Sequence, residues 1–259
     1  MIITDTHTHI QMPQFNKDRA EVIANALEHD VARMICPGTD IPTSVAAIEL
    51  AQQRPEHIFA AVGVHPHDTS GFSAASINEL RRLAQNTQVV AIGEIGLDFY
   101  RNLSPANDQI RAFTAQVTLA KELAMPIIIH SREAHRQIMD ILQPYGAVRG
   151  VMHCFIGDEA MAEEALALGL YISFAGPVTY PANTTLADVA AWVPADRMLI
   201  ETDAPYLSPH PMRRDRNEPA KVRRVAQKIA ELRGVSLEEI AAITTANAAK
   251  LFRLPEPAA

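Results

Sequence analysis

Short runs of Val, Ile and Leu alternate along the chain with longer segments whose apolar residues recur every three or four positions. The short continuous runs are typical of strands that are buried on both faces of a sheet, and the longer period is that of an amphipathic helix. On this basis we predict eight strands, which are Met1–Thr6, Val31–Cys36, His57–Val62, Val89–Gly93, Pro126–Ile129, Gly150–His153, Leu170–Phe174 and Met198–Glu201.

A helical segment follows nearly every predicted strand. The segments between strands are Lys17–His29, Thr43–Arg54, Ser76–Gln85, Asn107–Leu123, Ala134–Leu142, Asp158–Leu168 and Thr184–Trp192. After the last strand, Asn217 is predicted to cap a helix that has Pro219 in its first turn and runs to about residue 233. Ser236 and Glu239 then have the spacing of a capping box, which predicts a final helix that runs to about Leu251.

The order of these elements indicates the fold class. Eight strand–helix repeats favour closure into a barrel over an open sheet. No Gly-rich fingerprint follows the first strand, which argues against a dinucleotide-binding fold. The sequence also contains no linker, low-complexity tract or run of charge that would divide it. We therefore predict an α/β protein with a TIM-type (β/α)8 barrel, formed as a single domain by residues 1–259.

Composition indicates the class of protein and the cellular location to expect. Hydrophobic residues make up 48% of the chain and charged residues 20%, as in a soluble protein with a sizeable core. No segment resembles a signal peptide, and no apolar run reaches the roughly 18 residues that a membrane span needs. We expect a cytoplasmic protein without membrane contacts, present as a monomer or weak oligomer. Cys36 and Cys154 lie far apart in apolar runs, which favours reduced thiols in the core.

Six potential metal ligands occur at or just after the ends of predicted strands. They are His7, His9, Glu94, His130, His153 and Asp203. The C-terminal ends of the strands of a parallel barrel share one rim, and active sites are built there. Because residues two apart on a strand point the same way, His7 and His9 can bind one ion together.

This ligand set is too large for one ion. Four imidazoles and two carboxylates exceed the ligands of a single tetrahedral ion and favour a two-metal site. We predict that Glu94 bridges the two ions, and that Asp203 binds one ion and accepts a proton from the attacking water. A carboxylated lysine is excluded as the bridge because the lysines fall in helical segments. Glu201 either orients the site as a catalytic partner or makes a structural hydrogen bond. The imidazole-rich set suits Zn²⁺, Mn²⁺ or Ni²⁺ at least as well as Mg²⁺.

Other side chains on the same rim are candidates for substrate contacts. His65 is predicted to contact substrate or a metal-bound water, and His67 suits this role as well as one in which Asp68 holds it in the loop. Arg132 and Arg216 could bind phosphate, although a solvated charge run is the alternative. Five aromatic residues could stack nucleobases or pack in the core, and these are Phe99, Tyr100, Phe155, Tyr180 and Tyr206.

At these positions the sequence resembles the TatD family of metal-dependent deoxyribonucleases in the amidohydrolase superfamily. The matching segments are Asp5-Thr-His-Thr-His9, Gly63-Val-His-Pro-His-Asp68, Ala91-Ile-Gly-Glu-Ile-Gly-Leu-Asp98, Ile129-His-Ser-Arg132, Met152-His-Cys-Phe-Ile-Gly157, Leu199-Ile-Glu-Thr-Asp-Ala-Pro-Tyr206 and Arg216-Asn-Glu-Pro219. They span nearly the whole chain in the family's order. The resemblance implies a TIM barrel, divalent ions bound by the six ligands named above, and hydrolysis of DNA phosphodiester bonds, often from a strand end.

These observations rank three functions. The leading prediction, which takes its substrate from the resemblance, is a 3′–5′ exonuclease that acts on DNA ends or single strands. The formal net charge of −7 excludes binding through a broadly basic surface, so contacts with DNA must be local. The alternative is an amide, ester or aminoacyl-nucleotide hydrolase in which the same water attacks a carbonyl carbon. The third interpretation, structural ions in an interaction protein, fits a ligand-rich rim poorly because structural sites are usually closed by four ligands.

Overall fold

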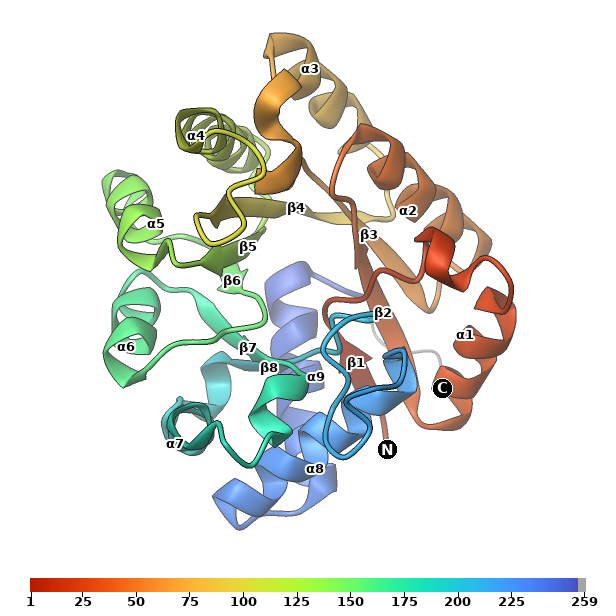
Figure 1. Cartoon of the computed structure of the whole chain (residues 1–259). Coiled ribbons are helices and arrows are strands. Elements are labelled where there is room, and N and C mark those ends of the chain that lie inside the picture. The colour runs from red at the N-terminus through yellow and green to blue at the C-terminus, as the bar shows by residue number, and fades with distance from the viewer. Residues whose placement is uncertain (256–259) are drawn as a thin grey trace.

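The computed structural model describes residues 1–255 and contains an eight-stranded sheet whose strands are ordered as in the chain. The strands are β1 (Ile3–Asp5), β2 (Val31–Pro37), β3 (Ile58–Val62), β4 (Val89–Asp98), β5 (Ile127–Arg132), β6 (Gly150–Met152), β7 (Tyr171–Phe174) and β8 (Met198–Ile200). Each strand pairs in parallel with the next. A bridge between Thr8 and Ala204, together with a hydrogen bond from the Thr6 amide to the Ile200 carbonyl (3.2 Å), joins the two ends of the sheet. The sheet is therefore a barrel, seen along its axis in Figure 1.

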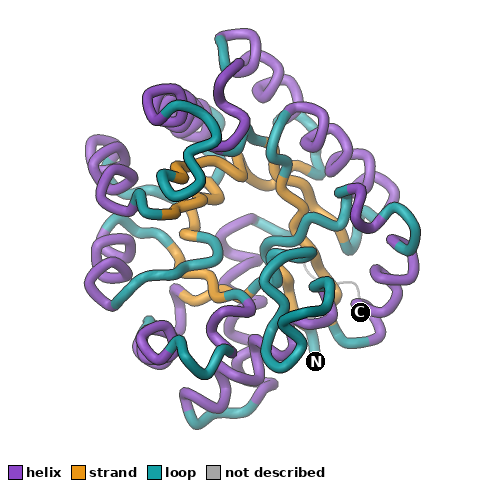
Figure 2. The backbone as a smooth tube through the Cα atoms, in the orientation of Figure 1, coloured by secondary structure: helices purple, strands orange, loops and turns teal. Residues whose placement is uncertain are grey.

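Helices surround this barrel (Figure 2). They are α1 (Arg19–Glu28), α2 (Ile41–Gln53), α3 (Ala74–Leu83), α4 (Ala106–Glu122), α5 (His135–Leu142), α6 (Glu159–Ala167), α7 (Thr184–Trp192), α8 (Val222–Arg233) and α9 (Leu237–Phe252). The predicted single-domain TIM barrel is confirmed. The last residues of the predicted domain, 256–259, lie outside the described residues. None of the described helices is long and apolar enough to cross a membrane.

The alternation of side chains along the strands divides the core into two clusters. One face of each strand packs against the helices in a large cluster that includes Met34 and Ile129. The other face points into the barrel, where seven strands contribute to a second cluster. Leu251 and Phe252 at the end of α9 join this inner cluster, so α9 closes the N-terminal end of the barrel (Figure 1). The opposite, C-terminal end of the barrel is its open end, where the residues that follow the strands lie.

Two strands are longer than the sequence predicts. β4 continues to Asp98 and β5 to Arg132, because the two pair through Gly96 with His130 and through Asp98 with Arg132. The predicted ends at Gly93 and Ile129 are therefore wrong, and Glu94 and His130 lie within strands.

The segment after β8 also departs from the prediction at Asn217. A short 3-10 helix, Pro219–Lys221, precedes α8, and Asn217 caps neither. Its buried side-chain amide instead donates to the carbonyls of Thr202 (2.8 Å) and Tyr206 (2.7 Å), which fixes the loop that carries Asp203. Ser236 is the N-cap of α9 as predicted, and its hydroxyl accepts a hydrogen bond from the Glu239 amide (3.1 Å).

Candidate metal centre

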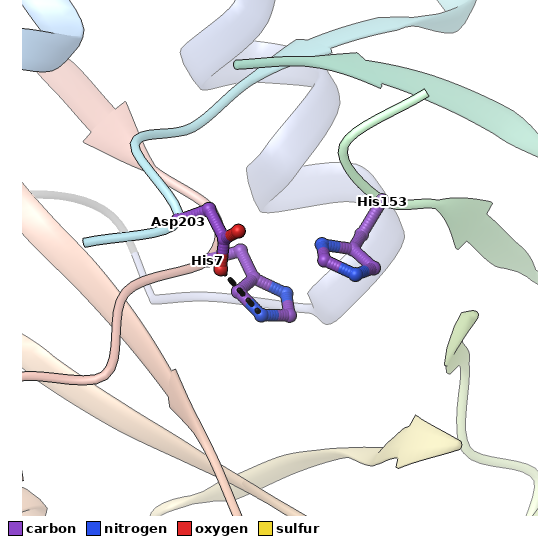
Figure 3. A group of neighbouring side chains, drawn as sticks. All are labelled: His7, His153 and Asp203. Carbon is purple, nitrogen blue, oxygen red and sulfur yellow. Dashed lines mark ion pairs between the residues drawn. The ribbon is translucent and has the colours of Figure 1, made fainter. Parts of the chain in front are cut away.

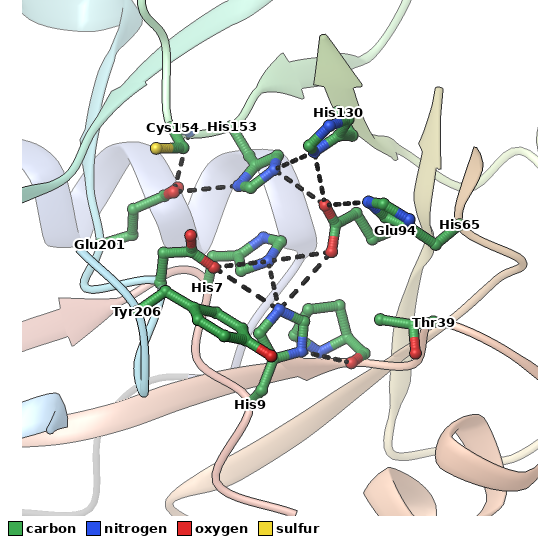
Figure 4. A network of polar contacts seen from close by, with 12 residues as sticks. His7, His9, Thr39, His65, Glu94, His130, His153, Cys154, Glu201 and Tyr206 are labelled. Atoms are coloured by element: carbon green, nitrogen blue, oxygen red, sulfur yellow. Dashed lines mark hydrogen bonds and ion pairs between the residues drawn. The ribbon is translucent and has the colours of Figure 1, made fainter. Parts of the chain in front are cut away.

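The six predicted ligands converge at the open end of the barrel, where Figure 4 labels five of them and Figure 3 labels Asp203. His7 and His9 lie just after β1, and Asp203 lies just after β8. The ends of the sheet meet at these two segments, and we call this junction between β1 and β8 the barrel seam. Here the Asp203 amide donates to the His7 carbonyl (2.9 Å) and the His9 amide donates to the Ala204 carbonyl (2.7 Å). Asp203 has a left-handed backbone (φ 57°), so the chain turns at this residue instead of continuing the strand.

One group of ligand atoms forms around Oε2 of Glu94. This oxygen lies 3.4 Å from His7 Nε2 and 3.5 Å from His9 Nε2, and the two nitrogens are 3.1 Å apart. Asp203 Oδ1 completes the group at 3.8 Å from His7 Nε2 and 3.6 Å from His9 Nε2. Ligands at about 2.0–2.1 Å from a tetrahedral ion are about 3.3 Å from one another. The atoms of His7, His9 and Glu94, and likewise those of His7, His9 and Asp203, therefore have a spacing that suits the ligands of one divalent ion.

A second group forms around the other oxygen of Glu94. Oε1 lies 3.0 Å from His130 Nδ1 and 3.0 Å from His153 Nε2, and these nitrogens are 3.3 Å apart. His65 Nε2 is 3.3 Å from the same oxygen. Glu94 thus faces a different set of imidazoles with each oxygen, as a bridging carboxylate must.

The two groups are in contact with each other. The rings of His7 and His153 stack at 3.9 Å with 11° between their planes, and Asp203 lies on the other side of His7 (Figure 3). Three sets of side chains, which overlap across the two groups, have potential ligand atoms within 4.8 Å of one another. These sets are His7, His153 and Asp203; His7, His9 and Glu94; and His65, Glu94 and His130.

Carboxylates behind the imidazoles set their orientation. Glu201, which is buried, accepts hydrogen bonds from the Cys154 amide (2.8 Å) and the Ser173 hydroxyl (2.5 Å), and its Oε1 lies 3.1 Å from His153 Nδ1. Asp98 Oδ2 lies 3.3 Å from His130 Nε2. Partners of this kind fix the tautomer and the ring angle of a ligating histidine.

Imidazoles and carboxylates of the cluster shift one another's pKa values. Burial alone would raise the pKa of Glu94, but the imidazoles of His65, His153 and His7 lower it well below its usual value. Burial opposes protonation of His153, yet Glu94 and Glu201 raise the pKa of this imidazole well above its usual value. Burial lowers the pKa of His65 to about 4. The cluster therefore holds a positive charge next to Glu94, and a metal cation can replace the proton that supplies it.

The residues that were predicted to contact substrate do not all lie in the cluster. His65 lies in the cluster itself, and His67 is held by Asp98 (2.8 Å), not by Asp68. Arg132 is exposed at the end of β5, with its guanidinium 4.0 Å from the centre of the Tyr100 ring.

Arg216 is not brought to the cluster. Its guanidinium pairs with Asp18 (2.6 Å) and Glu218 (2.9 Å) and also donates to the Gln14 carbonyl (2.8 Å). These contacts tie the loop after β8 to the segment before α1, so Arg216 has a structural role that the sequence interpretation did not include.

Two buried carboxylates were missed by the sequence interpretation. Asp98 ends β4 and shares a strand face with Glu94, a signal that was lost when the strand was predicted to end at Gly93. Asp5 lies two residues before His7 and accepts from the Thr202 amide (2.9 Å) and hydroxyl (2.6 Å), which strengthens the seam between β1 and β8. Cys154 was predicted to be a core thiol but is only partly buried, beside the cluster.

Comparison with known proteins gives a consistent result. The sequence model of the family described as TatD related DNase matches residues 4–253. The chain is 43% identical to the "Uncharacterized metal-dependent hydrolase YabD" of Bacillus subtilis, over 98% of this chain and 100% of that protein. It is 42% identical to the "3'-5' ssDNA/RNA exonuclease TatD" of Erwinia tasmaniensis, over 96% of this chain and 99% of that protein. The crystal structure of the TatD homologue YjjV from Escherichia coli superimposes with a TM-score of 0.92 at 32% identity, covering 98% of both chains.

Proposed function

The chain belongs to the TatD family of metal-dependent DNases, and from this premise we propose that it is an exonuclease that removes nucleotides from 3′ ends of single-stranded DNA. The proposed cofactor is a pair of divalent metal ions. The observation that carries the proposal is the placement of Glu94, whose two oxygens each face a separate group of imidazole nitrogens.

Each residue has a distinct role in this proposal. His7, His9 and Asp203 would hold one ion, His130 and His153 would hold the other, and Glu94 would contact both. Such a pair of ions would supply an activated water and stabilise the charge on the attacking and leaving oxygens of a phosphodiester. The nitrogen-rich ligand set suits Zn²⁺, Mn²⁺ or Ni²⁺ at least as well as Mg²⁺, so all four are candidates.

Asp203 is the proposed proton acceptor. Burial would raise the pKa of Asp203, but the hydrogen bond to His9 and the charge of His7 lower it. Its carboxylate is therefore ionised at neutral pH, and because Oδ1 is the ligand atom, the other oxygen of the carboxylate, Oδ2, is the proposed site of protonation. Glu201 is the proposed positioning residue, since it holds His153 from behind.

Substrate contacts complete the proposal. His65 is the proposed contact for the scissile phosphate, and this is supported by its position in the cluster at Oε1 of Glu94. Arg132 is the proposed contact for the next phosphate of the strand, since it is exposed on the rim. The cytoplasmic location and the monomeric or weakly oligomeric state expected from the sequence also belong to this proposal.

The test is a digestion of a 5′-labelled single-stranded oligonucleotide by protein that has been stripped of metal and then loaded with each ion in turn. The proposal expects a ladder of shortened products that requires metal. Asp203→Asn should abolish the ladder, while Asp215→Asn, an exposed carboxylate of the same loop, should leave it unchanged. Esterase or amidase turnover by the loaded protein without DNA cleavage would support the alternative hydrolase and contradict the proposal.

A further inference from the structure

Exposed large apolar side chains are concentrated around the metal centre. Among the described residues, those on loops at the open end of the barrel are Tyr100, Leu103, Ile156, Tyr206 and Leu207. Tyr100 is 58% exposed and Tyr206 is 47% exposed. The others of this kind, Met1, Ile2 and Trp192, lie away from these loops. Exposed apolar groups gathered at one site mark a surface that contacts a ligand.

Tyr100 and Tyr206 lie on turns that begin at Asp98 and Asp203, respectively. The Arg101 amide donates to Asp98 Oδ1 (2.7 Å), and Asp98 also contacts His130. This turn fixes Tyr100 next to one side of the cluster. The Tyr206 amide donates to the Asp203 carbonyl (2.8 Å), and the centre of the Tyr206 ring lies 6.3 Å from that of the His9 ring. Figure 4 shows these two side chains next to each other.

The turns face each other across the centre. Tyr100 follows β4 and Tyr206 follows β8, and these strands are four apart in a barrel of eight. Hydrogen bonds fix the backbone of each turn, and the rings themselves contact Arg132 and His9, so part of the conformational freedom that stacking would cost is already lost.

Arginines lie over Tyr100 and over the half-buried Tyr180. The Arg132 guanidinium lies 4.0 Å from the centre of the Tyr100 ring, and Arg101 is exposed in the same turn as Tyr100. On the other side, the exposed Arg213 lies 4.0 Å from the centre of the Tyr180 ring. In a chain of net charge −7, these cations provide local attraction for a polyanion. Aromatic rings next to cations form the surface that binds unpaired nucleic acid.

Building on the proposed function, we propose that Tyr100 and Tyr206 are two stacking platforms for unpaired nucleobases, one on each side of the metal centre. The backbone that joins two stacked bases then crosses the centre, where Glu94 and Asp203 lie. A duplex end cannot use the platforms until its bases separate, so the platforms select single strands. Phe99 and Phe155 have no such role, because they pack against or within the core.

The test measures binding of a fluorescent, hydrolysis-resistant phosphorothioate oligothymidylate to the metal-loaded protein by anisotropy. Tyr100→Ala and Tyr206→Ala should each weaken binding about tenfold, because each removes one stacked base. Trp192→Ala is the matched control, since this aromatic is 39% exposed at the end of α7, and it should change nothing. An abasic strand of the same length and charge should bind equally to the wild type and to all three variants.

The outcomes separate this inference from the proposed function. If both tyrosine variants bind the oligothymidylate as the wild type does, the inference is wrong and the exposed rings serve another contact, such as a protein. If the tyrosines are needed for binding but no phosphodiester is cleaved with any ion, the proposed function fails and the platforms stand. If the variants also cleave the abasic strand more slowly, the tyrosines shape the centre and the platform role is contradicted.

Discussion

The two ends of the barrel interior are built from the same strand faces but have opposite chemistry. On three strands, an apolar residue of the inner cluster is followed two positions later by a residue of the candidate metal centre. The pairs are Ile128 and His130 on β5, Val151 and His153 after β6, and Leu199 and Glu201 after β8. Because side chains two apart share a face, each of these three strands contributes one layer to the core and the next layer to the site.

This difference separates stability from function. The apolar end is buried and is closed by α9, so the removal of its side chains from water stabilises the folded state. The polar end buries imidazoles and carboxylates, whose desolvation is offset only by their contacts with one another or with bound ions. Substitutions at the apolar end should therefore change the free energy of unfolding, and substitutions at the polar end should change metal binding and activity.

The largest effect should follow Glu94→Gln, since this side chain serves both groups of ligands. The loss of several kcal/mol of metal-derived transition-state stabilisation should reduce DNA cleavage by about 10⁴-fold. Elemental analysis should show fewer than two bound ions per chain. Glu163→Gln, an exposed carboxylate of α6, should retain full activity and metal content. Full activity in Glu94→Gln would show that the ions are not bridged here.

The next effect is on folding, at the other end of the interior. Phe252→Ala should reduce the free energy of unfolding by about 3–5 kcal/mol, because it leaves a cavity in the inner cluster. Urea denaturation of the metal-free protein measures this, and the activity per folded molecule should not change. Leu103→Ala, at a side chain that is 63% exposed, should shift the free energy by less than about 0.5 kcal/mol. A large loss of kcat in folded Phe252→Ala would contradict the claim that the apolar end affects stability and not activity.

A smaller effect should follow Glu201→Gln, at the boundary between the two ends. The substitution weakens the contact that orients His153, so metal affinity or activity should fall by about 10- to 100-fold. Titration with a competing chelator measures the affinity. An unchanged affinity would assign Glu201 to the purely structural alternative, in which it only links Ser173 to the Cys154 amide.

The smallest effect is the pH dependence of metal binding. Because Glu94 and Glu201 raise the pKa of His153, its imidazole carries a proton at neutral pH in the metal-free protein. A metal ion must displace that proton, so the affinity should rise with pH by about tenfold per unit for each proton released, until the imidazole is deprotonated. Calorimetry in two buffers of different protonation enthalpy counts the protons. Release of none at pH 7 would contradict the raised pKa.

Much of this fold and site is legible in the sequence, for physical reasons. Buried parallel strands need continuous apolar runs, and a barrel places the residues that follow them on one rim, so the positions of His7, Glu94 and Asp203 suffice to predict that they meet. The resemblance to a known family supplied the substrate class, which the ligand pattern alone does not determine.

Other features depend on contacts between distant segments and could not be predicted. The extension of β4 to Asp98 depends on its pairing with β5, and the role of Arg216 depends on Asp18, which is almost two hundred residues away in the chain. Asn217 resembled a helix cap, but its amide satisfies carbonyls of the preceding loop. Local patterns do not contain these tertiary partners.

The central claim is that Glu94 bridges two ions, and anomalous X-ray diffraction from crystals of the Zn²⁺-loaded protein tests it most directly. The account predicts two anomalous peaks roughly 3.5–4 Å apart, with one carboxylate oxygen of Glu94 at each. The first peak should lie among His7, His9 and Asp203, and the second between His130 and His153. A single peak, or a second ion away from Glu94, would contradict the account.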